Sequence, residues 1–432
     1  KTYCGCGFEY SSIYFFIKYR IKLIQRIIKY LISIIMVVSS NSKEIRKINY
    51  NNNYIKLKIN EIGNITIYNK LNLCKDEAAP IPDKIYINEI NQSEIKSFYF
   101  FNQTNNEIKL VWKNIINSTA CMFSGCNKIN EIDLSNFDTS FVTDMKYMFL
   151  ECNSLTSLNL SNINTSQVTN MNEIFSRCEK LNSIDLSNFD TSQVTNMYGM
   201  FYACENVLFL DLSKFNTSQV TIMEHMFCGC EKITSLNLSN FNTSLVTTMK
   251  WMFASNYYKL RYIDLSSFNT SKVTNMYGMF DDSHNIISLN LSHFDTSNVK
   301  DMSYMFENCR NLIYLDLSNF NTLNVESIYG FFSGTSSLKY INLQNAKINN
   351  YLYIFNEILI YHDQLIICGE YDLKLNSSKI NINCKNNYNE SINYLCYMKF
   401  SNIINNNYLC DICGNNPTNN INCNRSEEHT SE

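Results

Sequence analysis

The sequence predicts an α/β repeat solenoid. Each 26-residue unit is expected to contribute one short strand and one short helix or 3₁₀ turn, with a parallel sheet along one face. Two observations lead to this fold class. A Met-Phe pair and a Leu return together at a fixed interval along the chain. Each interval also contains one segment with strand periodicity and one with helical periodicity.

The repeat interval is 26 residues, with one interval of 27 near Tyr257. The Met-Phe pair begins at Met122, Met148, Met200, Met226, Met252, Met279 and Met305, and Ile174-Phe175 and Phe331-Phe332 occupy the remaining positions. The recurring leucines are Leu134, Leu160, Leu186, Leu212, Leu238, Leu265, Leu291, Leu317 and Leu343. A single unit cannot bury enough apolar surface to fold alone, so neighbouring units are expected to stack.

Each unit contains both periodicities. The segment Leu158-Asn159-Leu160 alternates apolar and polar residues, which predicts a short strand. A spacing of i, i+3, i+6, i+7 predicts a helical face in a second segment, made of Val194, Met197, Met200 and Phe201. Ser192 and Thr195 precede or begin that face and are residue types that cap helices. Together the two segments describe a leucine-rich repeat.

The repeat divides the chain into five segments. Residues 1–42 hold a basic flank and a short apolar run, which match a secretory signal or, alternatively, a mistranslated leader. Residues 43–107 are expected to form a small β-rich N-terminal cap, and residues 108–346 a solenoid of about nine repeats. Residues 347–424 form a Cys-containing C-terminal module. Residues 425–432 change composition abruptly and are expected to be a non-native tail.

Composition and motifs exclude several functions. The net charge is -3 and 17% of residues are charged, so the basic stripe of a nucleic-acid binder is not expected. With 45% hydrophobic residues, the chain has enough apolar content for a core. The five histidines have no partnered nucleophile, and the sequence contains no P-loop, GxGxxG, GxSxG or HExxH motif. We therefore expect no enzyme activity, no cofactor and no metal site.

The string from Ile132 to Phe149, with a near copy from Ile184 to Phe201, resembles the BspA-like leucine-rich repeat surface proteins. The resemblance covers about residues 108–346. It implies a secreted or surface-displayed protein that binds a protein or glycan on another cell or on matrix, often in adhesion. The chain departs from the pattern where Asn256, Ser283 and Thr335 replace the repeated Cys.

A row of polar residues is expected on the outward strand face, between inward apolar neighbours. It consists of Asp133, Asn159, Asp185, Asp211, Asn237, Asp264, Asn290 and Asp316, and continues to Asn342. Aromatic residues share that face in the C-terminal half: Phe209, Tyr262, Tyr314 and Tyr340. Exposed aromatic residues are enriched at interfaces, which favours a recognition surface for protein, glycan or divalent cations. The alternative is a solvated sheet face.

The 17 cysteines fall into two main groups. The first recurs with the repeat at Cys126, Cys152, Cys178, Cys204, Cys230 and Cys309. Inter-repeat disulfides or a metal ladder are one interpretation. Small buried side chains at a tight corner are the other, and stacked side chains that point the same way fit disulfide geometry poorly.

The second group lies in the C-terminal module and is consistent with three disulfides: Cys368, Cys384, Cys396, Cys410, Cys413 and Cys423. The motif Cys410-x-x-Cys413 is alternatively half of a zinc site, for which one such motif is weak evidence.

Cysteine content, the leader and the resemblance favour a secreted or cell-surface glycoprotein that mediates adhesion-type macromolecular binding. Membrane contact would then need an anchor outside this sequence. Glycosylation sequons begin at Asn64, Asn102, Asn164, Asn216 and Asn389. The alternative is an intracellular leucine-rich repeat scaffold with free thiols or a C-terminal zinc module. The redox state of the C-terminal cysteines separates the two.

Overall fold

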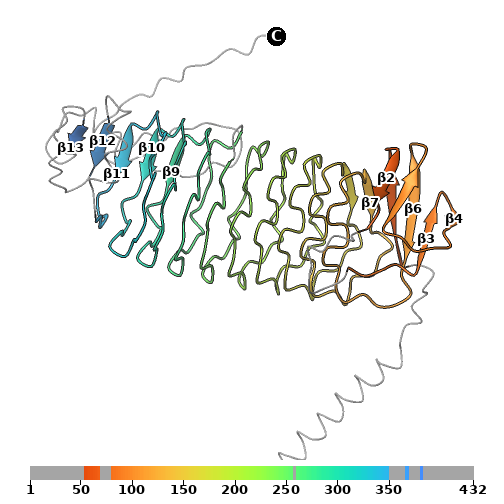
Figure 1. The fold of residues 1–432 in the computed structure, drawn as a ribbon. Coiled ribbons are helices and arrows are strands. Elements are labelled where there is room, and N and C mark those ends of the chain that lie inside the picture. The colour runs from red at the N-terminus through yellow and green to blue at the C-terminus, as the bar shows by residue number, and fades with distance from the viewer. Residues whose placement is uncertain (1–52, 69–78, 256–258, 350–364, 369–379, 383–432) are drawn as a thin grey trace, which may run out of the picture. The chain divides into compact units, whose positions relative to one another are not determined.

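The computed structural model describes residues 53–68, 79–255, 259–349, 365–368 and 380–382. The elements below all belong to the compact unit Tyr54–Glu432. Within the described residues, successive coils of the chain stack in a row, and short strands are assigned mainly near the two ends of that row (Figure 1).

The chain before the first coil forms six strands. They are β1 (Tyr54–Ile59), β2 (Gly63–Thr66), β3 (Lys84–Ile87), β4 (Ile90–Asn91), β5 (Phe98–Phe101) and β6 (Asn106–Val111). β2 and β5 pair as a separate two-stranded antiparallel sheet. β1 pairs antiparallel with both β6 and β7 (Glu131–Asp133), the first strand of the repeats. The edge of the first coil is therefore covered, with its backbone groups paired.

Two larger sheets contain the remaining strands. The first has the order β4-β3-β6-β1-β7-β8, and β8 (Ser157–Asn159) pairs parallel with β7. The second has the order β13-β12-β11-β10-β9, and every pair in it is parallel. Its strands are β9 (Ser288–Asn290), β10 (Tyr314–Asp316), β11 (Tyr340–Asn342), β12 (Leu365–Cys368) and β13 (Ile380–Ile382). Between the sheets, isolated parallel bridges such as Asn170↔Asn196 join consecutive coils.

The predicted α/β class, with a helix or 3₁₀ turn in each unit, is wrong. The described residues contain strands and turns but no helix, and the first large sheet mixes antiparallel with parallel strands. The segment from Val194 to Phe201 was predicted to be helical, and it instead forms irregular backbone with isolated bridges at Asn196, followed by turns from Tyr198 to Phe201. Its inward residues are nonetheless fully buried, because a chain of tight turns also brings about every third residue to one side.

Hydrogen bonding explains why this segment is not helical. The N–H groups of Met197, Gly199 and Phe201 donate to carbonyls of the following coil, at 3.1, 2.8 and 3.1 Å. The intervening Met200 and Tyr202 donate three residues back within their own coil, at 3.3 and 3.0 Å. Every second N–H is thus committed to a neighbouring coil. An α-helix would need each of these groups to donate four residues back along the same segment.

Two left-handed residues per coil produce this alternation. One precedes the Met-Phe pair and the other lies four residues later, as at His225 (φ 56°) and Gly229 (φ 74°). Left-handed backbone interrupts any right-handed helix. Glycine occupies the first position in three coils. At Gly278 it is also required by space, since an added Cβ would lie 2.3 Å from Cδ1 of Trp251 in the preceding coil.

The core is a set of ladders parallel to the coil stack. The repeated Phe rings stack face to face, with centroids 5.8 Å apart for Phe175–Phe201 and 5.9 Å apart for Phe201–Phe227. A second ladder of buried threonines connects the coils. The hydroxyl of Thr191 donates to the Asn216 carbonyl at 3.0 Å and accepts from the Asn216 N–H at 2.8 Å. Equivalent pairs of bonds recur from Thr139 onward.

Candidate binding surfaces

The predicted polar row, here called the strand strip, lies at the surface of the coils. Asn159, Asp185, Asp211, Asn237, Asp264 and Asn290 are exposed, and Asp133 and Asp316 are half-buried. The apolar residues on either side of most positions are buried, as the alternation of a strand requires, and Leu158 and Ile263 are partly buried against the core. The strand strip therefore runs from coil to coil on one face of the repeats.

One oxygen of each strand-strip residue closes a turn. Oδ1 of Asp185 accepts a hydrogen bond from the backbone N–H of Ser187 at 3.0 Å, and Oδ1 of Asp211 does the same for Ser213 at 3.0 Å. Bonds from these serines hold the pKa of both carboxyls below the usual range. The strip thus presents ionised carboxylates in a fixed orientation, with one oxygen of each already engaged.

The aromatic residues of the strand strip differ in accessibility. Phe209 is 58% exposed, and Tyr262 and Tyr340 are half-buried. Tyr314 is only 5% exposed, and its hydroxyl donates to Oδ2 of Asp316 at 3.3 Å. The expectation that Tyr314 belongs to an exposed aromatic patch is therefore wrong.

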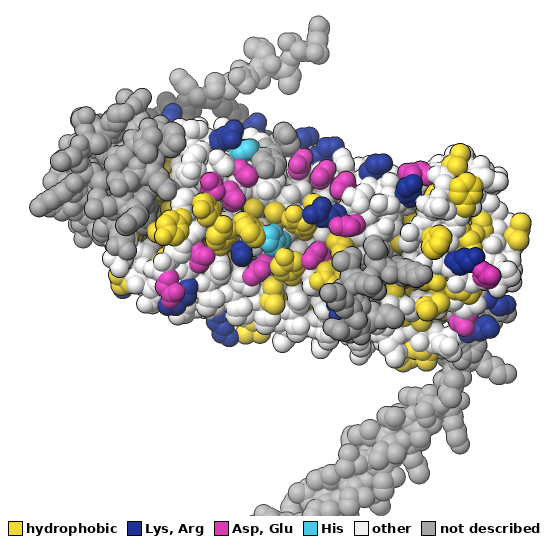
Figure 2. Space-filling model, in the orientation of Figure 1, with side chains coloured by type: hydrophobic (Ala, Val, Ile, Leu, Met, Phe, Trp, Pro, Cys, Tyr) yellow, Lys and Arg dark blue, Asp and Glu magenta, His cyan; other side chains and the backbone are white. Residues whose placement is uncertain are grey.

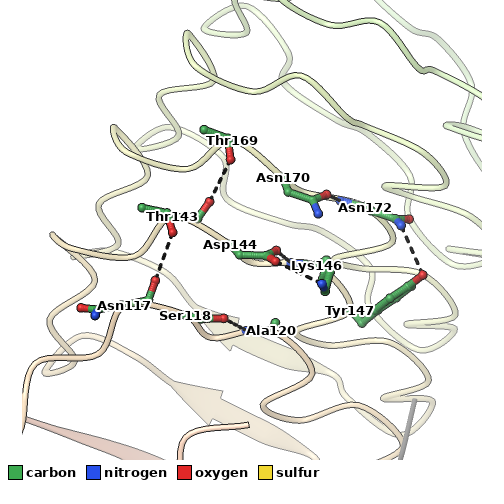
Figure 3. A network of polar contacts seen from close by, with 10 residues as sticks. All are labelled: Asn117, Ser118, Ala120, Thr143, Asp144, Lys146, Tyr147, Thr169, Asn170 and Asn172. Atoms are coloured by element: carbon green, nitrogen blue, oxygen red, sulfur yellow. Dashed lines mark hydrogen bonds and ion pairs between the residues drawn. The ribbon is translucent and has the colours of Figure 1, made fainter. Parts of the chain in front are cut away.

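A second surface, formed by the turns around the Met-Phe pairs, was not predicted. Figure 3 shows its first coils, where Asp144 and Asn170 each accept a bond from the backbone N–H two residues ahead, at 2.9 and 3.1 Å. Nδ2 of Asn172 donates to the Tyr147 hydroxyl at 3.2 Å, which connects adjacent coils. These turns fix the direction of the side chains that follow.

Aromatic side chains continue along this second surface. We call them the aromatic row, which consists of Tyr147, Tyr198, Tyr202, His225, Trp251, Tyr277, Tyr304 and Tyr329. Sequence reasoning missed the row because its positions vary between coils. The available signal was a Tyr or Trp within two positions before the Met-Phe pair, or before the equivalent Phe331-Phe332, in six coils.

The repeated cysteines are free thiols buried in the core. Cys126, Cys152, Cys178, Cys204, Cys230 and Cys309 are unpaired, as is Cys228. The thiol of Cys204 donates to the Phe175 carbonyl at 3.2 Å, and the other coils repeat this bond. Burial raises the pKa of Cys204 to about 12. These thiols remain protonated, which makes them poor nucleophiles.

Cys121 is disulfide-bonded, in contrast to the repeated cysteines. It was missed as a disulfide candidate, although it lies outside the position that the repeated cysteines share. Of the predicted C-terminal candidates, Cys368 ends β12 and its side chain is not described. Cys384, Cys396, Cys410, Cys413 and Cys423 lie outside the described residues.

Four of the predicted sequon asparagines are described, and all four are exposed: Asn64, Asn102, Asn164 and Asn216. Asn389 lies outside the described residues.

Across the described ranges, no three or more His, Cys, Asp or Glu side chains are grouped so that they could hold a metal ion. The same residues contain no helix that is long and apolar enough to cross a membrane.

Asp281, beside the aromatic row, has a pKa raised to about 7. Burial is the main cause, and the carboxylates of Asp282 and Glu307 add to it. A hydrogen-bond partner for its Oδ1 atom is absent among the described residues. In the unfolded chain the same group would titrate near its ordinary value of 3.8. Folding therefore favours the protonated form of Asp281 between these two values.

Replacing Asp281 by Asn is expected to stabilise the fold at high pH only. Below pH ~4 the Asp281 carboxyl is protonated in both the folded and the unfolded chain and does not lower the free energy of unfolding. The destabilisation grows as the pH rises to ~7, where the folded form also ionises. The full pKa difference corresponds to ~4 kcal/mol, which solvent screening of a partly exposed side chain reduces to ~2 kcal/mol. Urea unfolding at pH 4 and pH 8 tests this. An equal difference between variant and parent at both pH values would contradict it.

Comparison with known proteins identifies one family. The family described as "Mycoplasma protein of unknown function, DUF285" matches three overlapping stretches, residues 117–235, 205–288 and 255–362. These stretches follow the stacked coils and together cover more than half of the 432-residue chain. No curated protein matches the chain. With the repeat, the stacked coils and this match in agreement, the chain belongs to the DUF285 family.

Proposed function

We propose that this protein is secreted or displayed on the cell surface and binds a protein or glycan through the strand strip. The observation that carries the proposal is the strip itself, a row of exposed polar side chains that repeats with the coils. The interior of each coil is filled by Phe, Met, Leu and Thr ladders, so binding falls to the outward positions. Phe209, 58% exposed and on the same face, adds the aromatic area typical of interfaces.

Location outside the cytosol is supported by the disulfide of Cys121, since such bonds persist in oxidising compartments. The exposed sequon asparagines Asn64, Asn102, Asn164 and Asn216 are accessible to glycosylation there. The resemblance of the repeats to BspA-like surface proteins supports an adhesion role. The buried thiols do not favour the intracellular scaffold, because protonated, inaccessible thiols are inert in either compartment.

A non-reducing peptide map of the protein from its native cells tests the location. We expect the peptide containing Cys121 to be disulfide-linked, and at least one of the four exposed sequons to carry a glycan. Alkylation of Cys121 without prior reduction, together with unmodified sequons and bound zinc, would instead support the intracellular scaffold.

The binding surface is tested by the double variant Phe209→Ala with Tyr262→Ala on a printed array of matrix proteins and glycans. For every matrix protein or glycan on the array that the parent protein binds, we expect the double variant to bind at least ~10-fold more weakly, because aromatic anchors dominate interface energies. Phe141→Ala is the matched control, since Phe141 is 53% exposed but lies outside the strip. Equal binding by the parent and the double variant would remove the strand strip from the proposal.

A further inference from the structure

From Tyr198 to Tyr304 the rings of the aromatic row are in contact from coil to coil. Ring centroids are 4.6 Å apart for His225–Trp251, 5.0 Å for Trp251–Tyr277 and 5.3 Å for Tyr277–Tyr304. These side chains are half-buried, so each ring keeps an accessible part, and Tyr329 beyond them is 69% exposed. Hydrophobic side chains gather around a histidine in the face that Figure 2 shows, with acidic side chains beside them.

Glycines in the following coils make room for the large rings. A Cβ at Gly278 would lie 2.3 Å from Cδ1 of Trp251, and one at Gly330 would lie 2.4 Å from Cδ1 of Tyr304. Each ring therefore lies over the backbone of the next coil, in space that any other residue type would fill. The orientation of the rings is fixed by the coil beneath, which lowers the entropy lost when a partner binds.

The row already holds cations from its own chain. Nζ of Lys250 lies 4.5 Å from the ring centroid of Trp251 and 5.1 Å from that of Tyr277. The guanidinium carbon of Arg177 lies 5.5 Å from the ring centroid of Tyr202. These distances are within the range of cation–π attraction. The rings are thus arranged so that an ammonium or guanidinium group fits over them.

Carboxylates surround the same rings. Burial raises the pKa of Tyr198, and the negative charges of Glu173 and Glu224 raise it further. Tyr277 behaves likewise, beside Tyr304 and the carboxylates of Asp301, Asp281 and Glu307. Burial lowers the pKa of His225, so its imidazole is neutral at pH 7 and does not oppose a cation. Aromatic faces bordered by carboxylates favour positively charged ligands over neutral ones.

We infer that the aromatic row binds the Lys and Arg side chains of an extended polypeptide segment. From Tyr198 to Tyr304 the row crosses four coil steps, ~19 Å at the usual spacing of paired strands. A six-residue extended peptide has about the same length, ~20 Å, and places alternate side chains on one face. Lys250 occupies part of this site in the free protein. The inference concerns a surface separate from the strand strip and does not depend on it.

The test measures fluorescence anisotropy of a labelled hexapeptide that alternates Lys and Thr, titrated with the full chain. Lys250→Gln is expected to lower Kd by about 3–10-fold, because it vacates the rings and removes a like charge. Lys272→Gln makes the same change of net charge at an exposed position outside the row, and should alter Kd less than about 2-fold. Trp251→Leu is expected to raise Kd by at least ~10-fold.

Three outcomes would overturn the inference. The first is equal binding of a peptide that alternates Glu and Thr. The second is tighter binding of a neutral xylohexaose than of the Lys peptide, which would make the row a glycan site. The third is an equal effect of Lys250→Gln and Lys272→Gln on Kd, which would mean that Lys250 affects binding only through the net charge of the protein. The lysine pair keeps the test decisive if Trp251→Leu fails to fold.

Discussion

Replacing Phe201 by alanine is expected to lower the free energy of unfolding by ~3–5 kcal/mol. The Phe201 side chain is fully buried in the middle of the ring ladder. Its ring stacks between Phe175 and Phe227, with centroid distances of 5.8 and 5.9 Å. The substitution therefore removes contacts with both adjacent coils, and it also removes the free energy gained by burying the ring away from water. Backbone bonds from each coil to the next limit how far the space can close.

Urea unfolding followed by circular dichroism measures this loss. Phe209→Ala is the matched control and should change stability by less than ~0.5 kcal/mol, because the Phe209 ring is 58% exposed. A loss below ~1 kcal/mol for Phe201→Ala would show that neighbouring coils close over the space. In a repeat array, a weakened central interface can also split unfolding into two steps, which would appear as a lower denaturant slope.

The repeat and its core were predictable from the sequence. Apolar identity at a fixed interval requires the same residue of every unit to face the same way, whatever the local backbone. Met197, Met200 and Phe201 are each fully buried, as their recurrence predicted. The polar strand strip was predictable for the same reason, because alternation next to buried leucines leaves only one outward direction.

The backbone of the Met-Phe segment was not predictable from spacing. Inward residues at i and i+3 fit a helix, and they also fit consecutive turns whose alternate N–H groups bond to the next coil. The left-handed positions that distinguish these turns from a helix are not always glycine in the sequence, since Glu173, His225 and Trp251 also adopt left-handed backbone. The informative signal was glycine at the same position in other coils, as at Gly278.

Many Asn and Asp side chains of the repeats close turns of the backbone. Three Asp or Asn side chains in one coil accept bonds from backbone N–H groups two residues ahead: Asp133, Asp138 and Asp144, at 2.9 Å each. Later coils repeat these turns with either residue type. A short side chain with an acceptor oxygen is what the turn needs, and both residues supply it.

The aromatic row could not be derived from a single unit. Its members come from three different positions of the repeat, and Tyr202 follows the Met-Phe pair whereas Tyr277 precedes it. Two of the rings also need a glycine in the next coil, as Trp251 needs Gly278 and Tyr304 needs Gly330. Such complementarity between neighbouring units depends on the stacking itself. The strand strip, in contrast, follows from alternation within one unit.

Replacing Thr191 by valine is expected to lower the free energy of unfolding by ~2–4 kcal/mol, because it leaves two backbone groups of the next coil unpaired. The side chain is fully buried and valine has nearly the same shape, so packing changes little. What is lost is the hydroxyl, which donates to the Asn216 carbonyl at 3.0 Å and accepts from its N–H at 2.8 Å.

Two further variants separate the hydroxyl from the rest of the Thr-Ser pair. Thr191→Ser retains the hydroxyl and is expected to recover most of the stability lost in Thr191→Val. Ser192→Ala removes the neighbouring, partly exposed hydroxyl and should cost less than ~0.5 kcal/mol. If Thr191→Val and Thr191→Ser were equally destabilised, the bonds between coils would not be the source of the effect. Rescue by serine alone would establish that the threonine ladder, repeated in coil after coil, stabilises the stack through its hydrogen bonds.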